Sequence, residues 1–507
     1  MSTGGERRGV VLAVILIGYL LILIDVSILF AALPTIHRDL GFSATGLSWA
    51  QNAYTLAFGG LLLLGARAGD LVGRRRMFMV GIGVFAAASL AVGLAQSPAW
   101  MVAARAVQGL GAAILAPSTL ALLSTSFPEG TQRTRAMAAY GALAGLGTAF
   151  GLIVGGVLTT TLSWRIGFFL NVPVGLAAIV AAPRVLPETV PHAGRLNVSD
   201  ALSSTVGVSA IVFGIVHSAD AGWGDPVTVG ALAAGLTLVG AFITRQHRVD
   251  EPLMPLRLFA DRERAGAYAV RFLFNGVLVS WFFFMTQYLQ GVSDFTPLEA
   301  GLAFLPVTGA AFAAAAATSR LTRRVDTRRL TIAACAAMLI GTALTSRVSP
   351  TTGYALGIAL PMLVFGIGQG LGLSTLTTAG MAAVAPQDAG VAGALINVAH
   401  HLGGALGLGI LITVFDAAGA GQHGRALLAD RVSASFTAAC VLLVLALVVT
   451  VLARPHRHAQ ALAPVHETAT AAATAATRRP RVSPTQAPTR SATAAPEPAL
   501  HPSTRRT

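Results

Sequence analysis

The sequence repeats one feature many times: an apolar stretch long enough for a helix of about 20 residues, bounded by short polar segments. Such a helix rises about 30 Å, which matches the hydrocarbon core of a bilayer. Because 54% of the residues are hydrophobic and only 11% are charged, a water-soluble globule could not enclose this much apolar surface. We therefore expect an all-α integral membrane protein and not a β-barrel.

Apolar stretches between polar breaks predict fourteen transmembrane helices. Cytoplasmic loops retain positive charge, and the arginines gather in alternate segments that begin with the N-terminus. Both termini are therefore predicted to be cytoplasmic, with the chain crossing a bacterial cytoplasmic (inner) membrane many times. The predicted spans are residues 10–32, 46–65, 77–96, 99–124, 136–158, 166–183, 201–219, 227–244, 265–289, 298–318, 330–347, 353–377, 392–414 and 432–453.

A weakened repeat relates the two halves of the chain. The loop 65–76 returns at 319–329, and each copy joins the second and third helices of a six-helix set. Two related bundles with extra helices between them are a transporter architecture. The tail is rich in Ala, Pro, Thr and Arg and lacks a periodic apolar face, which predicts disorder. The predicted parts are a cytoplasmic N-terminus (1–9), an N-terminal six-helix bundle (10–183), a linker with two extra transmembrane helices (184–264), a C-terminal six-helix bundle (265–453) and a disordered cytoplasmic tail (454–507).

The net charge of +14 does not indicate a nucleic-acid partner, because the arginines lie in short loops and in the tail, not in a soluble basic domain. The two cysteines, Cys335 and Cys440, fall inside apolar spans, which argues against a disulfide framework or a metal site. We expect no cofactor and no metal, a lipid bilayer as the surroundings, and a monomer as the working unit.

The loop 65–76 combines glycines, one acid and several arginines. It resembles the signature between helices 2 and 3 of the major facilitator superfamily, in which glycines allow a tight turn and charged groups form ion pairs that break and reform during alternating access. Anchoring by positive charge alone would explain the arginines but would not need the glycines. The gating candidates that the resemblance implies are Gly65, Gly69, Asp70, Gly73, Arg74 and Arg75.

Other segments resemble the fourteen-helix drug:proton antiporter branch of that superfamily. They are Asp25-Val-Ser27 with Ala32-Leu-Pro34, Trp49 with Tyr54, Trp164-Arg165 with Phe168-Phe-Leu-Asn171-Val-Pro173, and Tyr288-Leu-Gln290 with Pro297-Leu-Glu299. The resemblance implies the major facilitator fold, with two six-helix bundles and two additional central helices. It also implies secondary transport, not enzymatic chemistry.

Asp25 in the first span and Arg105 in the fourth both lie at membrane depth. Arg105 and Gln108 resemble a further superfamily signature that is associated with proton transfer. An arginine in a membrane needs a cavity or a partner, because its insertion costs roughly 2.5–3.5 kcal/mol. Asp25 and Arg105 are similarly distant from the outer ends of their helices, so we predict that they pair. The pairing then either holds Asp25 ionised until a proton or another cation competes with Arg105, or it is a fixed structural ion pair.

The fifth span contains glycines at four-residue spacing, which lets helices approach closely. They resemble the glycine-rich helix of superfamily antiporters, although Leu152 stands where those proteins usually have proline. Packing alone would also explain these glycines. The residues concerned are Gly147, Gly151, Gly155 and Gly156.

The later spans contain three further features, two of which have two interpretations each. His400 and His401 could sense protons, because histidine titrates near neutrality, or could serve helix packing. Arg271 is interpreted as snorkelling towards the cytoplasm. Aromatic side chains of the ninth span either line an apolar drug pocket or face lipid. They are Phe272, Phe274, Trp281 and Phe282–Phe284.

The sequence as a whole predicts proton-coupled efflux of hydrophobic or cationic small molecules, such as drugs and antibiotics, by alternating access. The same fold could instead export one metabolite, a self-made antibiotic, a siderophore or an amino acid. An integral-membrane enzyme is the remote alternative, because such enzymes need clustered acids, histidines or a nucleophile in long loops, and these loops are short.

Overall fold

The computed structural model describes six ranges of the chain, and all regular elements within them are helices. The predicted tail, 454–507, lies outside the described residues. The described ranges are residues 3–43, 45–127, 130–189, 197–249, 252–384 and 388–453.

The N-terminal helices follow the predicted spans but are longer. The sixth predicted span, 166–183, is broken into two helices at Leu170, which lies between α6 and α7. The first helix continues beyond its apolar core at both ends, because polar residues can extend a helix outside the hydrocarbon layer of the membrane. The helices are α1 (Thr3–Leu40), α2 (Ser48–Val72), α3 (Arg74–Gly93), α4 (Pro98–Ser126), α5 (Thr131–Thr161), α6 (Trp164–Phe169) and α7 (Asn171–Val185).

The remaining helices also match the predicted spans in order. The tenth and twelfth predicted spans are each interrupted, the tenth at Phe304 and the twelfth by a short π-helical segment. The elements are α8 (Val198–Ala221), α9 (Pro226–Gln246), η1 (Leu256–Phe259), α10 (Arg262–Gly291), α11 (Pro297–Ala303), α12 (Leu305–Leu321), α13 (Thr327–Thr345), η2 (Ala355–Ala359), α14 (Leu360–Gly380), α15 (Ala389–Ala417) and α16 (Gly424–Leu452).

Thirteen helical segments of the described chain are long and apolar enough to cross a membrane. The predicted span 136–158 lies within α5, a continuous helix of 31 residues, of which Ala149–Thr161 counts as a shorter apolar helix by the same measure. The expectation of a helical multi-pass membrane protein is confirmed.

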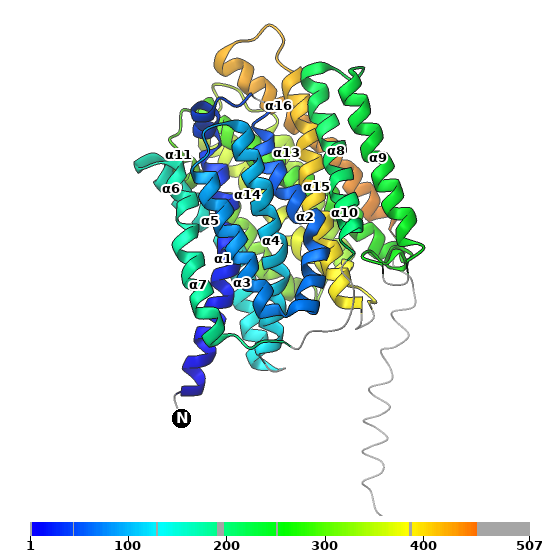
Figure 1. The fold of residues 1–507 in the computed structure, drawn as a ribbon. Helices are drawn as coiled ribbons and strands as arrows, with labels where there is room; N and C mark the ends of the chain where they lie inside the picture. Colours follow the sequence, from blue (N-terminus) through cyan, green and yellow to red (C-terminus); the bar gives the residue numbers. More distant parts are fainter. Residues whose placement is uncertain are drawn as a thin grey trace, which may run out of the picture. The chain divides into compact units, whose positions relative to one another are not determined.

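Helices pack mainly within the two halves of the sequence. In the first half α4 packs on α2 and α3, and α1 packs on α5; in the second half α14 packs on α12 and α13, and α10 packs on α15 and α16. The halves meet where α2 contacts α15 and where α5 contacts α11 and α12. The two additional helices, α8 and α9, pack on each other, and α8 also contacts α2 and α15 (Figure 1).

Most aromatic side chains of α10 are buried between helices, so the interpretation that they face lipid is wrong for them, and their role in lining a drug pocket stays a prediction. Trp281 stacks on Phe365 of α14 with ring centroids 4.3 Å apart, and Phe284 stacks on Phe415 of α15 at 5.2 Å. Phe283 is also fully buried. The reason is that α14, α15 and α16 enclose α10, so most of its surface contacts other helices.

Candidate functional site

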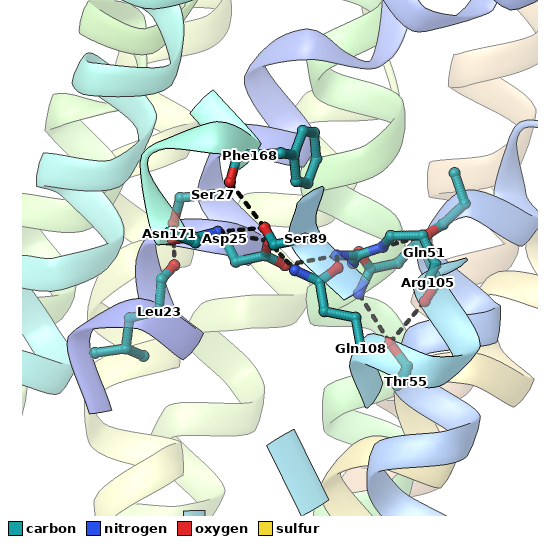
Figure 2. Close-up of polar contacts among 11 residues, drawn as sticks. Leu23, Asp25, Ser27, Gln51, Thr55, Ser89, Arg105, Gln108, Phe168 and Asn171 are labelled. Carbon is teal, nitrogen blue, oxygen red and sulfur yellow. Dashed lines mark hydrogen bonds and ion pairs between the residues drawn. The ribbon is translucent and has the colours of Figure 1, made fainter. Parts of the chain in front are cut away.

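Asp25 of α1 and Arg105 of α4 form an ion pair in the interior of the N-terminal helices (Figure 2). The Arg105 Nη1 atom lies 2.5 Å from the Asp25 Oδ2 atom, and both side chains have 0% exposure. The structure therefore brings together the two residues that the sequence predicts to pair. With no exposed surface, neither charge can exchange its partner for water without a movement of the surrounding helices.

The other carboxylate oxygen of Asp25 accepts hydrogen bonds from two amide side chains. Gln108 Nε2 donates to Asp25 Oδ1 at 2.6 Å, while Gln108 Oε1 accepts from Arg105 Nη1 at 2.8 Å. Asn171 of α7 donates to the same Asp25 oxygen at 3.3 Å. Two helices, α4 and α7, thus hold the carboxylate of α1, and each of these contacts is a donation that favours the ionised form.

A polar chain links Asn171 to Ser89 and on to the Phe168 carbonyl (Figure 2). Asn171 Nδ2 donates to Ser89 Oγ of α3 at 2.8 Å, and Ser89 Oγ donates to the Phe168 carbonyl at 2.9 Å. The sequence analysis did not assign Asn171 or Ser89 to the site. Asn171 did stand in one of the resembling motifs, and a buried amide in an otherwise apolar segment was the signal available for it.

Arg105 is held to α2 independently of Asp25. Its Nε donates to the Ala50 carbonyl at 3.0 Å, and its guanidinium carbon lies 4.3 Å from the centre of the Tyr54 ring. The close approach of α4 to α2 depends on Gly109, because a Cβ atom there would lie 2.4 Å from the Tyr54 carbonyl oxygen. Protonation of Asp25 would remove its negative charge while Arg105 kept its contacts to Ala50, Tyr54 and Gln108.

The glycine stripe of α5 packs against α1 on both sides of Asp25. A Cβ atom on Gly147 would lie 2.9 Å from Leu23, one on Gly151 would lie 2.6 Å from Ser27 Cβ, and one on Gly155 would lie 2.8 Å from the Ile28 backbone. The four-residue spacing therefore places α5 directly on the segment of α1 that carries Asp25.

Gly156 points to a different neighbour than the other three glycines. A Cβ atom at Gly156 would lie 2.6 Å from the Pro297 carbonyl oxygen of α11, and one at Gly301 would lie 2.6 Å from the Leu152 carbonyl oxygen. Both glycines permit the contact between α5 and α11 that joins the two halves. Leu152, the departure from the resembling pattern, is fully buried at this crossing.

The charged loop between α2 and α3 forms two sets of ion pairs. Arg74 Nη2, at the start of α3, lies 2.6 Å from Asp70 Oδ1, near the end of α2. Arg75 Nε lies 3.3 Å from Glu188 Oε2, and Glu188 also accepts from the Arg75 backbone N–H at 3.2 Å. Glu188 was not predicted as a site residue. The usable signal was an acid shortly after the sixth predicted span, on the same predicted side of the membrane as the arginine-rich loop 65–76.

The glycines of this loop have different roles. Gly73 has φ of 109°, a left-handed conformation that disfavours other residues, and it separates α2 from α3. Gly65 lets α2 approach α4, because a Cβ atom there would lie 2.1 Å from the Ala113 carbonyl oxygen. At Gly69 the nearest atom would be 3.8 Å away, so packing does not require glycine there.

His400 and His401 lie on α15 where it meets α2, apart from the Asp25 contacts. The His401 ring centroid is 4.0 Å from that of Phe58, and the two histidine rings lie 5.1 Å apart. In the described part of the chain, neither ring forms a hydrogen bond or ion pair with Asp25 or Arg105, and His400 Nδ1 has no partner.

Arg271 does not snorkel, which corrects the sequence-based interpretation. Its side chain is 7% exposed and its Nη1 donates to the Leu373 carbonyl of α14 at 2.9 Å. The reason is that α10 is enclosed by its neighbours, so the side chain has no lipid-facing surface along which to extend.

A multi-pass helical bundle in two halves, with a buried ion pair and small-residue contacts between helices, is the arrangement of a membrane transporter. Among the described residues, no group of three or more His, Cys, Asp or Glu side chains could hold a metal ion. Residues 15–408 match the Major Facilitator Superfamily, and the chain belongs to this family. It is a transporter and not an enzyme.

The chain is similar in sequence to two named bacterial proteins and in fold to a solved structure. The chain is 42% identical to the puromycin resistance protein pur8 of Streptomyces alboniger, over 80% of this chain and 82% of that protein. It is 38% identical to the cephamycin export protein CmcT of Amycolatopsis lactamdurans, over 78% of this chain and 82% of that protein. The fold is similar to that of a bacterial homolog of the human lysosomal transporter Spinster, with a TM-score of 0.62 and 17% identity. The match covers 88% of this chain and 97% of that chain.

Proposed function

We propose that this protein exports drugs or antibiotics across the bacterial cytoplasmic membrane in exchange for protons, by alternating access of its two helical bundles. Relatives whose names state antibiotic resistance or export support the direction and the class of cargo. The bundles are residues 10–183 and 265–453, with both termini in the cytoplasm.

The observation that carries the proton coupling is the arrangement around Asp25. The carboxylate is fully buried and is held by Arg105 and Gln108 of α4 and by Asn171 of α7. A proton on Asp25 cancels its attraction to Arg105. Arg105 itself stays bound to α2 through its hydrogen bond to the Ala50 carbonyl. The helix α1 then loses its electrostatic tie to α4 and can shift relative to it, so that protonation changes which arrangement of helices is favoured.

The contacts between the two halves supply the outer gate in this proposal. Gln290 Nε2 donates to the Ala31 carbonyl at 2.9 Å, and the Leu298 backbone N–H donates to Thr160 Oγ1 at 3.1 Å. With a cytoplasmic N-terminus, these atoms lie near the outer ends of α1, α5, α10 and α11. Release of cargo to the outside requires them to separate, while on the inner side the ion pairs of Asp70 and Glu188 rearrange.

The cargo is a small lipophilic or cationic molecule, and the transporter acts as a monomer in the lipid bilayer. A narrower cargo is the second candidate, because both relatives described above are named for a single antibiotic. Export of one self-made antibiotic would use the same coupling site. Transport of a panel of chemically unrelated compounds separates a multidrug exporter from a single-antibiotic exporter.

The test is ethidium transport in everted membrane vesicles under an imposed pH gradient. We expect gradient-dependent uptake with the wild type and its loss with Asp25→Asn. The matched control is Asp39→Asn on the same helix, whose asparagine oxygen can still accept the 2.9 Å hydrogen bond from Trp164 Nε1. Transport by Asp25→Asn equal to that of the wild type would refute the coupling role of Asp25.

A further inference from the structure

Arg271 of α10 is a buried cation with a donor atom that has no hydrogen-bond partner. Its side chain is 7% exposed, its Nη1 donates to the Leu373 carbonyl at 2.9 Å, and its Nε has no partner. Within the described residues, no ion pair joins Arg271 to a carboxylate. A guanidinium carries five donors, so a buried one without an anion has room for a ligand.

Two other buried arginines show that this situation is not general. Arg105 also has a nitrogen without a partner, Nη2, but its charge is paired with the Asp25 carboxylate. Arg264, two turns before Arg271 on the same helix, is also 7% exposed, but its Nε donates to the Leu258 carbonyl at 2.6 Å and its Nη1 to the Ala382 carbonyl at 3.2 Å. Backbone carbonyls thus satisfy Arg264, whereas the Nε of Arg271 is left without an acceptor.

Other unpartnered polar atoms occur on the helices around Arg271. Asn275 lies one turn further along α10, its Nδ2 donates to the His400 carbonyl at 2.5 Å, and its Oδ1 has no partner. His400 Nδ1 and Gln369 Oε1 are also buried without partners. Gln369 lies one turn before Leu373, the residue that accepts from Arg271, so both are on the same face of α14. Three helices therefore contribute unsatisfied polar atoms to one region.

An aromatic pair lies on two helices of the other half of the molecule. Tyr19 of α1 stacks on Tyr140 of α5, with centroids 4.0 Å apart and an interplanar angle of 13°. The helix that carries Tyr19, α1, packs against α10, the helix that carries Arg271. A cation on one bundle and a flat aromatic surface on the other together match a planar molecule that bears an anionic group.

We propose that Arg271, with His400 beside it, binds the anionic group of the cargo, a carboxylate or phosphate, while the aromatic part of that molecule packs on Tyr19 and Tyr140. The proposal rests on the transport function proposed above and extends its cargo class from lipophilic and cationic compounds to aromatic anions and zwitterions. Because α1 and α5 belong to one half and α10 and α15 to the other, such a ligand contacts both bundles at once.

The test measures equilibrium binding to the purified full chain in phosphatidylcholine nanodiscs, by calorimetry without any gradient. The probes are 2-naphthoate and its neutral isostere 2-naphthamide. We expect the wild type to bind the carboxylate at least about tenfold more tightly than the amide, because a hydrogen bond to a charged group is stronger than one to a neutral group. An equal affinity for the two probes, or no binding of 2-naphthoate, would overturn the proposal without any variant.

Variants locate the effect at one side chain. Arg271→Gln is expected to weaken 2-naphthoate binding about 10- to 100-fold and to leave 2-naphthamide binding unchanged. Arg271→Lys keeps the charge but loses the forked geometry, so an intermediate affinity is expected, and this variant also serves if the glutamine variant fails to fold. Arg264→Gln is the matched control and should bind both probes as the wild type does. Unchanged 2-naphthoate affinity in a folded Arg271 variant would refute the assignment.

Phosphatidylglycerol in the nanodiscs identifies the source of the anion. Competition with 2-naphthoate in the wild type means that a lipid headgroup phosphate occupies the subsite, and no competition means that the site is reserved for the cargo. The binding assay needs no proton gradient, so its failure alongside gradient-driven ethidium transport would reject only the anion subsite. Intact binding without gradient-driven transport would instead reject the proposed coupling.

Discussion

The buried ion pair makes a quantitative prediction about the stability of the folded chain. Asp25→Asn and Arg105→Gln, made separately and together, form a double-mutant cycle. Each single change leaves one member of the 2.5 Å ion pair without its charged partner, in a place where neither side chain has exposed surface. Removal of one partner from a buried ion pair lowers the free energy of unfolding by about 3–5 kcal/mol.

The two single changes are not expected to be equal. Arg105→Gln should lie at the upper end of that range, because it also removes the 3.0 Å bond to the Ala50 carbonyl and the contact at 4.3 Å with the Tyr54 ring. Asp25→Asn should lie at the lower end, since the asparagine oxygen can still accept from Arg105. The double variant buries no unpaired charge, so its loss should be about 1–3 kcal/mol smaller than the sum of the two.

The assay is reversible unfolding of the purified chain in mixed micelles, followed by tryptophan fluorescence at fixed detergent composition. Asp39→Asn on α1 is the control and should change the free energy of unfolding by less than about 0.5 kcal/mol. Additive losses in the cycle would show that Asp25 and Arg105 do not stabilise each other, and would refute the reasoning from their contact.

Three further predictions concern other contacts. Gly156→Leu should force α5 away from the α11 backbone and reduce transport. Gly141→Leu on the same helix should do neither, because no atom lies within 4 Å of a Cβ at Gly141. Transport in vesicles and labelling of the outer face measure the two effects. Glu188→Gln should weaken its contact with Arg75, 3.3 Å away, and lower the transport rate roughly tenfold at unchanged protein abundance. Hydrogen bonds from the first-turn N–H groups of α9 hold the pKa of Asp225 below its usual range. This capping is complete above the pKa of Asp225 in the unfolded chain and is lost as the pH falls through the lowered value. The protection of the first amides of α9 against hydrogen exchange, relative to an unfolded peptide at the same pH, should therefore fall only in strong acid. Protection that is already lost at neutral pH would contradict the prediction.

Part of the candidate site could be predicted from the sequence because depth in a membrane is a local property. Counting residues from the ends of two spans placed Asp25 and Arg105 at one level, and the structure has them in contact. Asn171 and Glu188 could not be assigned in this way. Their partners come from helices whose rotation about their own axes is not encoded in any single span.

That the chain is a helical multi-pass membrane protein follows from local sequence, because hydropathy and length decide whether a segment can cross a bilayer. The sequence also determined where the buried charges lie along the chain. Only the tertiary structure decided which neighbour each polar group has. The same type of side chain therefore has three environments: Arg105 is paired with Asp25, Arg264 is satisfied by backbone carbonyls, and Arg271 is left with an unpartnered Nε. The physical reason is that packing of separate helices, not local hydropathy, brings acceptors to a buried donor.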